Sequence, residues 1–119
     1  MSDCLFCKIV KGDIPSQKVY EDELVYAFHD IHPLCLTHVL VIPKKHIASL
    51  AAVTPEDEPV LGRLLSVAQK LAAENGSTDG FRAIINTGRI GGQEVPHLHM
   101  HILGGAEPVG RMVEATSKN

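Results

Sequence analysis

Residues 97–103 read His-Leu-His-Met-His-Ile-Leu, so three histidines alternate with apolar residues. Alternation with a period of two is typical of a strand that buries one face. The pattern predicts a strand from about residue 95 to residue 103, in which Leu98, Met100 and Ile102 face the core. The three histidines then share the opposite face, on an open side or in a cleft. From the rise per residue, His97 and His101 lie ~13 Å apart on such a strand.

Three chemical interpretations fit a row of histidines on one face. The row could have no role, or a His-x-His pair could chelate a metal, although one tetrahedral ion does not easily reach all three. Alternatively, a neutral imidazole could attack phosphorus or an acyl carbon, while a neighbouring histidine binds phosphate or moves a proton. The adjacent glycines Gly91 and Gly92 precede the row. They could expose N–H groups to an anion or simply form a hairpin turn. Together, these features favour a phosphate site.

The rest of the chain predicts alternating short strands and helices. A short helix is expected from Cys4 to about Lys11, capped by Ser2 or Asp3. A long helix is expected from Pro55, with Thr54 as its N-cap, to a stop at Asn75-Gly76. Further strands are expected at residues 18–21, 24–29, 37–43 and 81–86. Short connections make the sheet mainly antiparallel, with the long helix on one face, which is an α+β domain.

Composition limits the possible classes of protein. The chain has 119 residues, 45% hydrophobic and 21% charged, which predicts one globular domain over residues 1–119. A net charge of −3 and a pI near 6.1 disfavour a nucleic-acid partner. The longest apolar stretch is too short to cross a bilayer, and no signal peptide is recognisable, so we expect a cytoplasmic protein without a membrane partner.

The number of cysteines is three, which argues against a closed disulfide framework. In a reducing compartment, the Cys4-x-x-Cys7 pair favours metal binding or redox chemistry. Two small packed residues on a short helix remain an alternative interpretation.

Several segments, in this order, resemble the histidine triad superfamily. They are residues 4–16, 27–31, 37–46 and 86–105, and the last contains the alternating histidines. The most similar branch is the Hint-type nucleotide-binding proteins. The resemblance implies a purine nucleoside phosphoramidase that acts through a covalent nucleotidyl-histidine. It also implies a homodimer, with the antiparallel sheet continued across the interface.

The resemblance implies a role for each matching residue. His99 resembles the nucleophile that attacks the α-phosphorus, His101 the residue that contacts the phosphate, and His38 an upstream histidine lining the same site. Asp30 matches the carboxylate that binds the ribose hydroxyls. Walls of the base pocket are matched by Phe6, Ile9, Phe28 and Ile31. Positions around the phosphate and the leaving group are matched by Asn86, Gly92, Gln93 and Glu94.

Two residues depart from the family pattern. Many relatives have a serine that donates to the leaving group where this chain has Glu94, and many have an aromatic residue where it has Pro96. A carboxylate at position 94 repels phosphate, so its side chain either points away or contacts an amine. Because proline lacks a backbone donor, Pro96 indicates a strand start or a sheet edge. Both departures leave the substrate preference open.

Some bacterial members of the superfamily pair two such cysteines with two histidines, which correspond here to His46 and His97. The resemblance therefore implies a structural zinc at Cys4, Cys7, His46 and His97, apart from His99, and no cofactor for catalysis. Two other functions stay open. One is a nucleotide-binding regulatory module that acts through a protein partner with weak residual catalysis. The other is a zinc-dependent hydrolase with the histidines as catalytic ligands.

Overall fold

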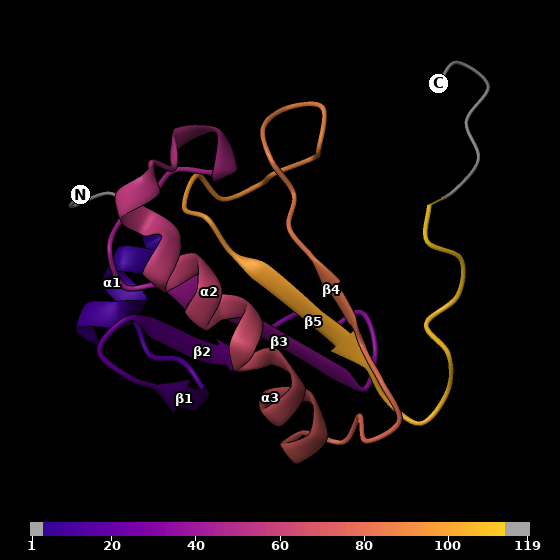
Figure 1. Ribbon diagram of the computed structural model, residues 1–119. Coiled ribbons are helices and arrows are strands. Elements are labelled where there is room, and N and C mark those ends of the chain that lie inside the picture. Colours follow the sequence, from indigo (N-terminus) through magenta and orange to yellow (C-terminus); the bar gives the residue numbers. More distant parts are fainter. Residues whose placement is uncertain (1–3, 114–119) are drawn as a thin grey trace.

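The computed structural model describes residues 4–113. Its sheet has the strand order β1-β2-β3-β5-β4, and each neighbouring pair is antiparallel (Figure 1). The strands are β1 (Lys18–Glu21), β2 (Val25–His29), β3 (Thr37–Pro43), β4 (Arg82–Ile84) and β5 (Met100–Gly104). The predicted α+β class with five mainly antiparallel strands is confirmed.

The predicted long helix is present but divided. A 3₁₀ turn at Leu50–Ala52 and another at Pro55–Asp57 lead into α2 (Glu58–Ser66) and α3 (Ala68–Glu74). The start is fixed by Asp57, whose carboxylate accepts from the Thr54 N–H at 3.0 Å. The break at Val67 follows Ser66, whose hydroxyl donates to the Arg63 carbonyl at 3.2 Å. That carbonyl also accepts from the Val67 N–H, and serine bonds of this kind commonly bend helices.

Helices cover both faces of the sheet, which explains why all of β3 is buried. On one face, α2 and α3 pack on a cluster that includes Val39, Val41 and Met100. On the other face, α1 (Leu5–Lys11) packs on a cluster that includes Leu40 and Ile42. Figure 1 shows α2 and α3 running across the sheet and α1 near one end of β2.

The first helix begins later than expected and is capped by a different residue. Its N-cap is Cys4, whose sulfur accepts from the Cys7 N–H at 3.4 Å. Ser2 and Asp3, the predicted caps, lie outside the described residues. Gly12 ends α1 with φ of 85°, a conformation that glycine adopts without strain. Within residues 4–113, no helix combines the length and apolarity needed to span a membrane.

The prediction of a last strand beginning near residue 95 is wrong, because β5 begins at Met100. Val41 pairs with Met100, so continuing the ladder would bring Leu98 opposite Pro43. Proline has no N–H to offer a ladder, and the Leu98 N–H instead donates to the Ile47 carbonyl at 2.7 Å. His97 and His99 therefore precede the strand. Similarly, β4 is limited to Arg82–Ile84 rather than residues 81–86.

Side chains of residues 97–102 still alternate between the two faces of the sheet, although residues 97–99 do not pair with another strand. Leu98, Met100 and Ile102 belong to the cluster under α2 and α3, as predicted. The rings of His97 and His99 lie on the opposite side, against Phe6 of α1. Both histidines are nevertheless buried, with 0% and 6% of their surface exposed.

Candidate functional site

Two histidines meet on the sheet face that carries α1. His38 comes from β3 and His101 from β5, where the pairing of Leu40 with His101 makes them diagonal neighbours. Their rings are joined by a contact of 2.9 Å between His38 Nε2 and His101 Nδ1. The Leu34 N–H donates to His38 Nδ1 at 3.1 Å. Because that nitrogen accepts, a neutral His38 carries its hydrogen on Nε2 and donates it to His101.

The same chain of bonds fixes the state of His101. Its Nδ1 accepts from His38, so a neutral His101 carries its hydrogen on Nε2. Burial, together with the nearby rings of His99 and His38, lowers the pKa of His101 to about 4. Burial also lowers the pKa of His38, opposed by the charge of Asp30. At neutral pH, His101 therefore offers an N–H donor without a positive charge.

His99 is oriented by the chain's own backbone. Its Nδ1 lies 2.7 Å from the carbonyl oxygen of His97. A carbonyl only accepts hydrogen bonds, so Nδ1 carries the hydrogen and Nε2 keeps its lone pair. Edge-on contacts with Phe6 and His101, at ring distances of 5.2 and 5.1 Å, fix the plane of the ring. The result is a buried imidazole whose neutral form keeps its lone pair on Nε2.

Cys4, Cys7, His46 and His97 converge, with all four ligand atoms within 4.8 Å of one another. His97 Nδ1 lies 3.2 Å from Cys4 Sγ and 3.6 Å from Cys7 Sγ. The Cys7 sulfur lies 3.4 Å from His46 Nδ1. These separations suit ligands that each bind one tetrahedral ion at roughly 2.0–2.3 Å.

The chemistry of this cluster also fits a metal. His97 Nε2 lies 2.9 Å from the Pro43 carbonyl, to which it must donate, so the lone pair of Nδ1 faces the two sulfurs. Burial and the neighbouring Cys4 raise the pKa of the Cys7 thiol. A bound zinc ion would reverse that effect by stabilising the thiolate. The four residues would fill a tetrahedral shell and leave no position for water.

A second group of possible ligands consists of Asp30, His38 and His101, again within 4.8 Å of one another. The Asp30 carboxylate lies 3.4 Å from His38 Nε2. The Leu34 N–H, however, already occupies the lone pair of His38 Nδ1. His38 Nε2 therefore carries a hydrogen and has no lone pair for an ion. This geometry disfavours a catalytic metal held by these histidines.

A cleft of about 500 Å³ lies between the segment before β1 and the loop after β2. Its lining includes Asp30 and Ile31, which the resemblance assigns to the nucleoside, and also Gln17 and His29, which sequence reasoning did not identify. Ile31 is 82% exposed. The other expected walls of the base pocket are buried in the cluster under α1: Phe6, Ile9 and Phe28.

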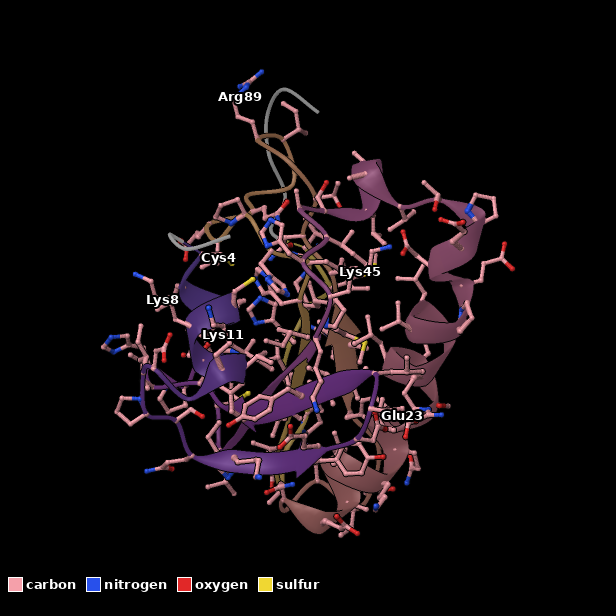
Figure 2. All side chains as sticks on the ribbon, turned by 90° about the vertical axis from the view of Figure 1, so that its left-hand side faces the viewer. Cys4, Lys8, Lys11, Glu23, Lys45 and Arg89 are labelled. Carbon is pink, nitrogen blue, oxygen red and sulfur yellow. The ribbon has the colours of Figure 1, made fainter. Side chains whose placement is uncertain are left out.

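The glycine-rich loop is a tight turn. The N–H groups of Gly91, Gly92 and Gln93 donate to carbonyls within the loop. A side chain at position 91 would place its Cβ 2.5 Å from the Thr87 carbonyl oxygen, so only glycine fits. These three N–H groups are therefore not directed at an anion. Arg89 stands at the far tip of the loop (Figure 2).

Other predicted residues of this loop have distinct surroundings. The Gln93 side chain accepts from the Gly88 N–H and donates to the carbonyls of Ala48 and Val95. Its side-chain amide is engaged in these three bonds, and its backbone N–H is bonded to the Gly88 carbonyl. Asn86 is half-buried and Glu94 is exposed. Glu94 borders an open cleft of about 520 Å³ between this loop and residues 48–49.

Comparison with known proteins identifies the family. The HIT domain profile matches residues 11–108. The chain belongs to the HIT domain family. The purine nucleoside phosphoramidase of Escherichia coli K12 is 49% identical over 112 residues, which cover 93% of each chain. The chain is therefore a HIT-family hydrolase.

Solved HIT structures share the fold. A histidine triad protein from Clostridium difficile has a TM-score of 0.87 and 46% identity, covering 93% of this chain and 97% of its own. A zinc-bound histidine triad family protein from Mycobacterium smegmatis has a TM-score of 0.78 and 35% identity, covering 91% of this chain and 78% of its own. Zinc is therefore found in a protein of this fold.

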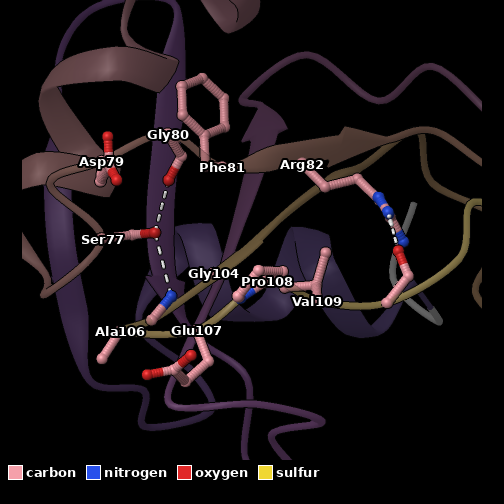
Figure 3. Close-up of a pocket in the computed structure, with 12 residues that line it drawn as sticks. Ser77, Asp79, Gly80, Phe81, Arg82, Gly104, Ala106, Glu107, Pro108 and Val109 are labelled. Atoms are coloured by element: carbon pink, nitrogen blue, oxygen red, sulfur yellow. Dashed lines mark hydrogen bonds between the residues drawn. The ribbon is translucent and has the colours of Figure 1, made fainter.

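A further cavity of this HIT domain, of about 330 Å³, has no histidine in its lining (Figure 3). It is formed where the chain leaves β5, and its lining includes Ser77, Arg82 and Gly104. Ser77 accepts from the Gly105 N–H and donates to the Gly80 carbonyl. Arg82 donates to the carbonyls of Gly110 and Arg111. Because Gly104 ends β5, this cavity lies roughly 16 Å along the chain from His99.

Proposed function

We propose that this protein hydrolyses the P–N bond of purine nucleoside phosphoramidates through a covalent nucleotidyl-histidine at His99. The observation that carries the proposal is the 2.7 Å bond from His99 Nδ1 to the His97 carbonyl, which leaves the lone pair of Nε2 free. The name of the E. coli relative, at 49% identity, supports the substrate class. No cofactor is needed, because the nucleophile is the imidazole itself.

The reaction follows from this arrangement in two displacements. The lone pair of His99 Nε2 attacks the α-phosphorus, and the P–N bond breaks as the amine leaves with its electron pair and takes up a proton from solvent water. The imidazole becomes positively charged, and its Nδ1–H remains bonded to the His97 carbonyl, which stabilises that charge. Water then attacks phosphorus and releases a proton to solvent, the P–Nε2 bond breaks and returns its electrons to the ring, and a nucleoside monophosphate leaves.

His101 and His38 support the phosphate in this proposal. With a pKa of about 4, His101 stays neutral and donates its Nε2–H to a phosphate oxygen. His38 donates to His101 and so keeps that tautomer in place. The charge that develops on the phosphoryl oxygens is met by an oriented donor that lies beside the buried rings of His38 and His99.

Asp30 and Ile31 bind the nucleoside in this proposal. The Asp30 carboxylate already accepts from the His32 N–H at 2.8 Å. Each carboxylate oxygen has two lone pairs, so both can still accept from ribose hydroxyls. Ile31 offers an exposed apolar surface in the same cleft, on which a base can stack.

The test is hydrolysis of adenosine 5′-phosphoramidate by the purified protein. We expect turnover by wild type, no measurable turnover by His99→Ala, and wild-type turnover by the control His32→Ala, whose side chain is exposed. Binding of adenosine monophosphate should survive in His99→Ala. Tight nucleotide binding by wild type without turnover would refute the hydrolase and favour a regulatory binding module.

We also propose a structural zinc ion at Cys4, Cys7, His46 and His97. The convergence of the four ligand atoms and the donation of His97 to the Pro43 carbonyl support it. Elemental analysis of protein refolded with zinc, without a His-tag, tests the site. A content near one ion per chain is expected, and less than about 0.1 would favour two packed cysteines.

We propose a homodimer whose sheet continues through β4. This strand pairs with β5 on one side, and no strand of the described residues pairs with its other side. An open edge is a place where a second copy can add its own strand. Light scattering at micromolar concentration should give twice the mass of 12.9 kDa, and a stable monomer would refute the dimer.

A further inference from the structure

The segment that carries His99 is not part of the sheet. Since β5 begins at Met100, no ladder bond fixes the backbone of residues 97–99 against a neighbouring strand. Something else must hold the nucleophile of the proposed reaction to within a fraction of an ångström. The contacts of this segment lead back, by three separate routes, to the four residues of the cysteine–histidine cluster.

We propose that the Cys4–Cys7–His46–His97 cluster, with its metal bound, is a positioning device that fixes the tautomer and the orientation of His99. The part that concerns turnover rests on the proposed function, whereas the part that concerns the ring of His99 does not. This differs from the expectation drawn from the sequence, in which the metal stabilised the fold and stood apart from the chemistry.

The first route runs through His97 itself. Its ring nitrogen Nδ1 faces the sulfurs of Cys4 and Cys7, at 3.2 and 3.6 Å. Its backbone carbonyl accepts the hydrogen of His99 Nδ1 at 2.7 Å. The same residue therefore supplies a metal ligand and the acceptor that sets the tautomer of His99. A shift of the His97 ring is transmitted to that carbonyl over only three bonds of backbone and side chain.

The second route runs through His46. The next residue, Ile47, accepts from the Leu98 N–H through its carbonyl at 2.7 Å. The rings of His46 and His97 also meet edge to face, with centroids 5.0 Å apart. Of the two residues before His99, His97 contacts the ligand His46, and Leu98 is bonded to the immediate neighbour of that ligand.

The third route runs through α1. Phe6 lies between the two cysteines, and its ring packs edge-on against His99, at 5.2 Å and 87°, and against His97, at 5.8 Å. The helix has seven residues, too short to be stable on its own in water. Bonds from Cys4 and Cys7 to an ion would anchor this helix and so keep the Phe6 wall in place.

Removing the ion leaves two thiols and two imidazoles joined by weak contacts. Residues 97–99 then gain conformational freedom, and the bond from His99 Nδ1 to the His97 carbonyl is made for only part of the time. An imidazole without that bond exchanges its hydrogen between the two nitrogens. The fraction of His99 with a lone pair on Nε2 falls, and with it the fraction of molecules able to attack phosphorus.

The experiment reads the ring of His99 directly. Protein labelled with ¹⁵N-histidine is compared as zinc-loaded wild type, chelated wild type, Cys7→Ser and the matched control Cys35→Ser. Cys35 lies outside the cluster, its thiol bonded to the Thr37 carbonyl. Long-range ¹H–¹⁵N spectra separate a nitrogen that carries hydrogen from one with a lone pair, and His99→Ala assigns the signals.

Zinc-loaded wild type and Cys35→Ser should show one His99 tautomer, with hydrogen on Nδ1. Chelated wild type and Cys7→Ser should show averaged signals, with kcat lowered roughly 10–100-fold and KM little changed, the usual cost of losing an orienting contact around a metal ligand. An unchanged tautomer in the zinc-free protein would overturn the proposal. A changed tautomer in a protein with no phosphoramidase turnover would support positioning and refute the proposed function instead.

A second comparison applies if the zinc-free protein unfolds. Cadmium is a larger ion that takes the same ligands, so the cadmium form keeps the fold while moving His97 outward slightly. A change in the His99 Nδ1 signal and in kcat between the zinc and cadmium forms supports the proposal. Identical signals and identical kcat would overturn it.

Discussion

The glycine pair at the end of β5 gives a test of the packing that does not depend on any function. A Cβ added at Gly104 would lie 1.9 Å from Ser77 Oγ and 2.7 Å from Ser77 Cβ. Ser77 is 1% exposed, and its hydroxyl bonds to the Gly80 carbonyl and the Gly105 N–H, so it cannot turn away freely (Figure 3). Gly104→Ala must therefore either strain the backbone or break both bonds.

The expected loss follows from these contacts. Overpacking of this kind costs ~1–3 kcal/mol, and each lost hydrogen bond costs ~1 kcal/mol. We expect Gly104→Ala to lower the free energy of unfolding by about 3 kcal/mol, within this range. The control is Gly62→Ala on the exposed side of α2, where an added Cβ meets nothing within 4 Å. It should stabilise by ~1 kcal/mol, the helix propensity gained over glycine.

Urea unfolding followed by circular dichroism measures both variants at one protein concentration. The free energy of unfolding should fall in Gly104→Ala and rise in Gly62→Ala. A double variant, Gly104→Ala with Ser77→Gly, should recover part of the loss, because the clashing hydroxyl is gone. A Gly104→Ala protein within about 0.5 kcal/mol of wild type, the usual scatter of surface substitutions, would refute this account of the close approach.

Three further predictions concern ion pairs, acid stability and the nucleoside. Arg63→Ala removes bonds of 2.6 and 3.1 Å to Asp22 and Glu23, and we expect a loss of ~1 kcal/mol in urea unfolding, since the pairs are partly exposed; no loss would show that they contribute nothing. Because the pKa of His101 is lowered to about 4, the unfolded chain binds a proton that the native state lacks between pH 6.5 and 4, so stability falls on acidification. The free energy of unfolding then changes with pH by at most about 1.4 kcal/mol per pH unit from one group. This dependence on pH should be weaker in His101→Gln, and an equal dependence would contradict the prediction. Asp30→Ala should weaken binding of adenosine monophosphate by roughly 1.5–3 kcal/mol in calorimetry, the loss of hydrogen bonds to a charged group, and an unchanged Kd would remove Asp30 from the site.

Much of the fold was predictable because its signals are local. The β-branched run at residues 37–43 predicted β3 with its observed bounds. The alternation of residues 97–103 predicted which side chains face α2 and α3. By contrast, the start of β5 depended on Pro43 and on the Ile47 carbonyl, which come from a distant segment. The break at Val67 depended on one serine hydroxyl that periodicity does not register.

The site was predictable as a set of residues but not as a set of bonds. The spacing of Cys4 and Cys7 alone left redox and packing alternatives open, and only the resemblance pointed to His46 and His97. The partners that fix the histidine tautomers are backbone groups: the Leu34 N–H and the carbonyls of Pro43 and His97. Almost any residue type can supply such a backbone group, so these bonds cannot be predicted from the sequence.

The central claim is that His99 Nε2 forms a bond to phosphorus, and one measurement tests it most directly. Zinc-loaded protein is mixed with adenosine 5′-phosphoramidate, quenched within the first turnover and digested under conditions that preserve phosphoramidate bonds, and the peptides are sequenced by mass spectrometry. The account predicts an adenylyl group on the peptide that contains His99, attached at His99 alone, and none in His99→Ala. An adenylyl group on His101 or His38, or turnover by His99→Ala at the wild-type rate, would contradict it.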